Sequence, residues 1–152
     1  MNKMSRVAVL GFAMVGSVVT GCGSDEDDSK GGYSKNALAD GVVSGHVKEW
    51  EVMLEADEVP AGEVTFEIEN QGTIQHEFLV VKTDVDLGQI PVEDGRFSEE
   101  QESILMVDEI PEYANGTTEQ LTVMLEPGVY QLVCNISGHY EAGMYTKLTV
   151  TA

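Results

Sequence analysis

Basic residues and cysteines are both scarce in this sequence. Only eight of its 152 residues are lysine or arginine, against 27 aspartates and glutamates, so the formal net charge is -19. Such an acidic surface repels phosphate, which excludes nucleic acid as a partner. It would attract a protein partner with a basic docking surface, although solubility in a salty habitat explains the same composition equally well.

A hydrophobic run long enough to span a membrane is also missing near the N-terminus. The apolar stretch at residues 7–19 has about 13 residues, whereas a transmembrane helix needs about 20. Lys3 and Arg6 precede it, which is typical of a cleaved export signal. The sequence Val-Thr-Gly-Cys, which ends at Cys22, resembles a bacterial lipobox. This resemblance implies removal of residues 1–21 and lipidation of Cys22; an ordinary signal peptide with an unmodified cysteine is the alternative.

The segment after Cys22 has little to bury. Residues 23–36 are mostly Gly, Ser, Asp, Glu and Lys, a composition that cannot offset the entropy lost on ordering. We therefore expect residues 22–44 to form a flexible acidic linker. Residues 45–152 are then one domain, long enough to close a single hydrophobic core. The predicted location is the cell envelope, with the domain lipid-anchored to the membrane and facing the periplasm or another extracytoplasmic space.

Short runs of alternating apolar and polar residues fill most of this domain. The apolar positions of three such runs are Trp50, Val52 and Leu54; Val64, Phe66 and Ile68; and Leu121, Val123 and Leu125. A period of two residues predicts half-buried β-strands. Turn sequences separate the runs, at Pro60-Ala-Gly, Asn70-Gln-Gly, Asn115-Gly and Pro127-Gly. Short strands at this spacing predict an all-β domain of the β-sandwich type.

One stretch, residues 83–115, has no clear period. Ser98-Glu-Glu-Gln within it resembles the start of a helix, and the apolar run Ile104-Leu-Met-Val follows. We expect an irregular surface insertion with a short helical turn and one edge strand. Because loops of this length are uncommon without a purpose, a docking segment is one interpretation.

Four residues have the types and order of a copper site: His76, Cys134, His139 and Met144. A thiolate with two imidazoles and a weak axial thioether suits electron-transfer copper, because soft sulfur favours Cu(I) while imidazole accommodates both oxidation states. Zinc is less favoured, since a thioether is a poor zinc ligand. Met144 competes with the carbonyl of Gln75 for the axial position. If Cys22 is lipidated, Cys134 is a lone thiol outside the cytoplasm, which a bound metal would protect from oxidation.

Strand alternation directs these side chains to one core. His76 has the parity of Phe78 and Val80 in a run that is apolar on both faces, as expected of a central strand. Cys134 has the parity of Tyr130 and Leu132, and Met144 that of Leu148 and Val150. The remaining histidine, His46, is expected on the surface before the first strand.

The run Cys-Asn-Ile-Ser-Gly-His-Tyr-Glu-Ala-Gly-Met at residues 134–144 resembles the closing motif of cupredoxins, the small blue copper proteins that include auracyanin, rusticyanin and sulfocyanin. The run that ends at His76, Pro-Ala-Gly-Glu-Val-Thr-Phe-Glu-Ile-Glu-Asn-Gln-Gly-Thr-Ile-Gln-His, is similar to the strands leading to the first histidine ligand of that family. The resemblance implies a Greek-key β-sandwich of about eight strands, one type 1 copper ion held by the four residues above, and one-electron transfer without catalysis.

Two positions depart from the family pattern. Many cupredoxins have Asn after the first histidine and Ser or Thr after the cysteine, whereas this chain has Glu77 and Asn135. We expect a swapped pair beside the metal, in which the Asn135 amide donates to the Glu77 carboxylate. This bond would clamp the loop of residues 134–144, the copper loop.

The histidine supply argues against an enzyme, because His46 alone cannot build the further metal site that a copper oxidase needs. The predicted function is a membrane-tethered electron carrier, monomeric, that exchanges electrons with a redox partner protein. The alternative is a copper-binding module for buffering or for delivery of copper to an envelope cuproenzyme.

Overall fold

The computed structural model describes residues 41–152. The predicted signal peptide, Cys22 and nearly all of the predicted linker lie outside these residues. Within the described part, no helix is long and apolar enough to cross a membrane.

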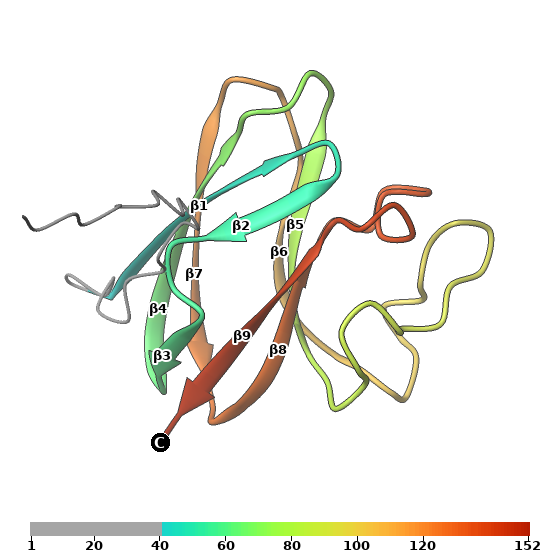
Figure 1. Ribbon diagram of the computed structural model, residues 1–152. Helices are drawn as coiled ribbons and strands as arrows, with labels where there is room; N and C mark the ends of the chain where they lie inside the picture. The colour runs from blue at the N-terminus through green and yellow to red at the C-terminus, as the bar shows by residue number, and fades with distance from the viewer. Residues whose placement is uncertain (1–40) are drawn as a thin grey trace, which may run out of the picture. The chain divides into compact units, whose positions relative to one another are not determined.

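Residues 41–152 form nine β-strands in two sheets (Figure 1). The strands are β1 (Val42–Lys48), β2 (Glu51–Leu54), β3 (Glu58–Pro60), β4 (Gly62–Asn70), β5 (His76–Lys82), β6 (Leu105–Tyr113), β7 (Thr118–Leu125), β8 (Gly128–Val133) and β9 (Tyr145–Thr151). The four-stranded sheet has the order β2-β1-β4-β7, and the five-stranded sheet has the order β3-β9-β8-β5-β6. Both sheets are mixed, because β1 pairs with β4 and β3 with β9 in parallel. The predicted all-β sandwich is confirmed, with nine strands where about eight were expected.

The main hydrophobic core contains inward-facing residues of both sheets. Phe78 on β5 packs against Phe66 on β4, with ring centroids 5.4 Å apart. Val52 and Leu54 are buried as the alternation predicts. The prediction for Trp50 is wrong: it lies in the turn before β2 and its side chain is 49% exposed. The hairpin turn extends through Trp50, so β2 begins at Glu51, one residue later than the alternation suggests.

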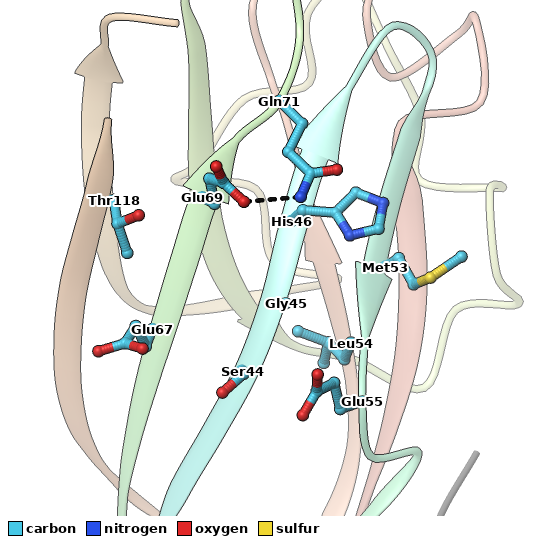
Figure 2. A pocket seen from close by; sticks show the side chains of 10 residues that line it. All are labelled: Ser44, Gly45, His46, Met53, Leu54, Glu55, Glu67, Glu69, Gln71 and Thr118. Carbon is cyan, nitrogen blue, oxygen red and sulfur yellow. Dashed lines mark hydrogen bonds between the residues drawn. The ribbon is translucent and has the colours of Figure 1, made fainter. Parts of the chain in front are cut away.

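His46 lies within β1 and not before the first strand, since β1 already begins at Val42, inside the segment that the sequence assigns to the linker. On the outer face of the four-stranded sheet it stands opposite Met53 of β2 and Glu69 of β4 (Figure 2). Its Nε2 is 3.4 Å from Glu51 Oε1. His46, Met53 and Glu69 line a pocket of about 360 Å³ on the outer face of the sheet. None of the predicted copper ligands lines this pocket.

The predicted insertion is partly regular. Strand β6 is the edge strand of the five-stranded sheet, so the irregular part is residues 83–104, coloured yellow-green to yellow in Figure 1. The expected helical turn at Ser98 is replaced by two turns, closed by Gln101 N–H to Ser98 O and Ile104 N–H to Gln101 O, both 3.2 Å. The insertion buries Ile90 and Phe97 against Leu79 and Val81 of β5, and so forms a second, smaller hydrophobic cluster.

Candidate metal centre

The predicted ligands converge because three strand ends meet at one end of the sandwich. His76 is the first residue of β5, Cys134 directly follows β8, and Met144 directly precedes β9. Backbone hydrogen bonds close the loop between them: Cys134 N–H donates to Met144 O at 3.0 Å, and Met144 N–H donates to His139 O at 3.1 Å. Cys134 and Met144 both belong to the main hydrophobic core, and His76 Nδ1 lies 4.0 Å from Cys134 Sγ, so the three side chains lie on the same side of the five-stranded sheet, as the parity predicts.

Three of the four residues bring their donor atoms together. The ligand atoms of His76, Cys134 and His139 lie within 4.8 Å of one another. Cys134 Sγ is 3.3 Å from His139 Nδ1 and 4.0 Å from His76 Nδ1, so both imidazoles turn the same nitrogen toward the sulfur. Two imidazoles and a thiol that converge in a buried site are a donor set that fits copper.

Burial shifts the pKa values of these groups. It lowers the pKa of His76 and of His139, which keeps both imidazoles neutral and available as ligands. Burial also raises the pKa of the Cys134 thiol to about 11, while the backbone N–H groups of Glu77 and Ile136 act in the opposite direction. These N–H groups are positioned to stabilise a thiolate, and binding of a metal would displace the thiol proton.

Met144 and Gln75 differ in burial. Met144 is fully buried and belongs to the same core cluster as Cys134. Gln75 is exposed, immediately before β5. Met144 is therefore placed to serve as an axial ligand, and the backbone carbonyl of Gln75 stays the alternative.

The predicted pairing of the Asn135 amide with the Glu77 carboxylate is wrong. Asn135 Oδ1 accepts from Phe97 N–H at 3.0 Å, and its Nδ2 donates to Phe97 O at 3.0 Å and to Glu99 Oε1 at 3.2 Å. The backbone N–H of Asn135 is the group that faces Glu77. The sequence pairing failed because strand alternation says nothing about an insertion that covers the other face of β5. Both residues still lie next to ligands and contact the loop that carries them.

The insertion also holds the copper loop through two further bonds. Gly138 N–H donates to Gly95 O at 2.8 Å, and Ser137 Oγ donates to Asp94 O at 3.2 Å. Gly95 has a positive φ of 82°, and a Cβ there would meet Ser137 Oγ at 2.6 Å, so glycine is required for this close approach.

Two further residues, which no pattern in the sequence predicted, contact His76 and His139. Glu49 Oε1 is 3.5 Å from His76 Nε2, and the Trp50 ring packs edge-on against His139 with centroids 5.0 Å apart. Both residues belong to the turn between β1 and β2. No sequence motif marks them, because their role depends on how this hairpin turn meets the other sheet.

The sulfocyanin (SoxE) domain family matches residues 54–152 of the chain. A search of curated proteins finds no match. Similar solved structures include dithionite-reduced auracyanin from the photosynthetic bacterium Roseiflexus castenholzii, with 21% identity, a TM-score of 0.55 and coverage of 74% of this chain and 98% of that one. An azurin from Methylomonas sp. strain J has 16% identity and a TM-score of 0.58, over 75% of this chain and all of that one.

Rusticyanin from Thiobacillus ferrooxidans is similar over 72% of this chain and 76% of its own, with 20% identity and a TM-score of 0.50. At such identities these structures establish a shared fold alone, whereas the family match covers most of the domain. The chain therefore belongs to the sulfocyanin domain family of cupredoxins, whose cofactor is type 1 copper.

Proposed function

We propose that this protein is a one-electron carrier whose single copper ion is held by His76, Cys134, His139 and Met144. The observation that carries the proposal is the convergence of three buried donor atoms within 4.8 Å. Bound copper would supply the one-electron redox change. The chain supplies neutral imidazoles, a thiol that faces two backbone N–H groups, and a site from which water is largely excluded.

The positions of the ligands favour electron transfer over copper delivery. Cys134 and Met144 are fully buried, and the loop between them is tied to the insertion at both Asn135 and Gly138. Release of copper would need this loop to open. Because their surroundings hold the donor atoms in place, these atoms would move little when the copper changes oxidation state. This favours electron transfer.

The visible spectrum of the copper-loaded domain tests the proposal. We expect an intense thiolate-to-copper absorption that disappears in Cys134→Ser, together with a reversible redox wave. Glu141→Gln is a control for a change within the same loop, because this side chain is exposed. A colourless protein that retains zinc in preference to copper would contradict the proposal. Rapid loss of copper to a chelator, with no reversible redox wave, would favour the buffering and delivery function.

We further propose that the redox partner has a basic docking surface. Residues 41–152 contain four basic residues, and three of them are beside glutamates: Lys48 with Glu51, Lys82 with Glu126, and Arg96 with Glu112. The domain at residues 41–152 therefore has little unpaired positive charge. At low salt, a cationic redox reagent should exchange electrons with the domain faster than an anionic one, and added salt should remove the difference. Equal rates at low salt would contradict this.

Anchoring to the membrane in the cell envelope is also a proposal, and it rests on the lipobox-like residues that end at Cys22. Under it, the residues between Cys22 and β1, which begins at Val42, would link the lipid to the copper domain. Metabolic labelling with a fatty acid in a bacterial host, with Cys22→Ser as the control, tests it. Unlabelled protein that is released from the membrane without its first 21 residues would indicate an ordinary signal peptide.

A further inference from the structure

The turn between β1 and β2 contains a carboxylate that faces a copper-ligand candidate from behind. Glu49 Oε1 is 3.5 Å from Nε2 of His76, while Nδ1 of the same ring faces Cys134 Sγ. The imidazole therefore lies between the sulfur on one side and the carboxylate on the other. The functional role of this arrangement depends on the proposed copper site. The contact between Glu49 and His76 does not depend on it.

Burial leaves Nε2 of His76 no other acceptor. The His76 side chain is fully buried, and its Nε2 has no regular hydrogen-bond partner among residues 41–152. A separation of 3.5 Å is long for an N–H···O bond. A buried N–H without a partner costs about 1–3 kcal/mol, so a small approach of the ring toward Glu49 is favoured.

The Glu49 carboxylate is held in place from the other side. Its Oε1 accepts hydrogen bonds from Thr73 N–H at 2.8 Å, from Ile74 N–H at 3.1 Å and from Thr73 Oγ1 at 3.2 Å. These three bonds hold the carboxylate in one position beside the imidazole. The carboxylate is thus a fixed negative charge and not a mobile surface group.

Gly72 makes the approach possible. A Cβ at this position would lie 2.7 Å from His76 Nε2 and 3.0 Å from both carboxylate oxygens of Glu49. Any side chain here would separate the two groups. The contact between Glu49 and His76 therefore requires a residue without a side chain at position 72.

We propose that Glu49 is a positioning residue for the copper site: it accepts the Nε2–H of His76, fixes the ring with Nδ1 toward the metal, and stabilises Cu(II) over Cu(I). An ordered carboxylate acceptor makes the imidazole a stronger donor, and a negative charge nearby favours the more highly charged metal. Glu49 thereby lowers the reduction potential.

The test compares Glu49→Gln with Glu51→Gln. Both remove one negative charge from the same hairpin, but the Glu51 carboxylate faces His46 and Lys48 on the outer face of the sheet, whereas that of Glu49 faces His76. Glutamine keeps an acceptor for Thr73 and Ile74, so the turn should hold. We expect Glu49→Gln to weaken Cu(II) binding by about tenfold or more, with Cu(I) binding less affected. A tenfold loss confined to Cu(II) raises the potential by about 59 mV. Equal potentials in the two variants would overturn the proposal.

Nitrogen NMR of the His76 ring in the metal-free domain gives a readout that does not depend on copper. We expect the Nε2–H tautomer in the wild type, with a proton that exchanges slowly with water, and faster exchange in Glu49→Ala than in Glu49→Gln. An Nδ1–H tautomer in the wild type would overturn the proposal even if copper binds. If no copper binds but the Nε2–H tautomer is present and depends on Glu49, the proposed function fails while the contact between Glu49 and His76 stands.

Discussion

The two faces of strand β5 are both buried, but by different parts of the chain. Toward the four-stranded sheet, Phe78 and Val80 belong to a core of 22 buried residues that also contains Cys134 and Met144. On the other face, Leu79 and Val81 belong to a cluster of six buried residues, formed with the insertion and with Tyr140 next to His139. The large core contains Cys134 and Met144, the two sulfur side chains proposed as ligands, while the small cluster anchors the loop that bears them. Stability of the fold and geometry of the site should therefore respond to different substitutions.

The largest effect should follow from Phe78→Ala, which empties a fully buried site in the large core. Loss of a buried phenylalanine ring costs about 3–5 kcal/mol, and we expect the whole domain to lose this stability in denaturant unfolding. Phe97→Ala is the matched change in the small cluster, since Phe97 is 3% exposed and packs edge-on against Tyr140. There the insertion can open locally, so hydrogen exchange should increase in residues 83–104 with less loss of global stability. Equal global losses would show that the two clusters unfold as one unit.

Asn135→Leu should have the next largest effect, because it separates the copper loop from the insertion. It removes the acceptor of Phe97 N–H and the donor to Phe97 O, both buried, at a cost of about 1–3 kcal/mol for each group left unpaired. The copper absorption should shift, because Asn135 directly follows Cys134. An unchanged spectrum in Asn135→Leu would mean that the insertion does not fix the site.

The sequence predicts the large core far better than the small cluster. Alternation located His76, Cys134 and Met144 on the correct face, because side chains of a paired strand must obey a period of two. The partners of Asn135 lie in residues 83–104, a stretch without a period, so the sequence could not reveal that its amide bonds to Phe97. Glu49 and Trp50 were not predicted for a related reason. Both lie in a hairpin turn of one sheet, and their contacts with His76 and His139 arise only from tertiary packing.

Met144→Leu should change stability little and the redox centre clearly. The substitution nearly conserves volume in a fully buried position, so we expect less than about 1.5 kcal/mol of destabilisation. If the thioether is the axial ligand, its removal takes a donor from Cu(II), and the reduction potential should rise. Leu148→Met, a change of similar size elsewhere in the large core, is the control and should leave the potential unaltered. A potential equal to that of the wild type would remove Met144 from the ligand set.

The smallest effect concerns the pH dependence of the metal-free domain, and it tests the face of β5 that the insertion covers. Burial raises the pKa of Glu77 from 4.5 to about 7, because desolvation outweighs the Asn135 N–H and Arg96. An acid whose pKa is raised by folding favours the folded state below its unfolded pKa and loses that contribution as pH rises to the folded value. The melting temperature should therefore fall between about pH 4.5 and 7, and Glu77→Gln should flatten this slope. Glu63→Gln, an exposed change on the four-stranded sheet, should leave the slope intact. A slope that persists in Glu77→Gln would show that another group causes it.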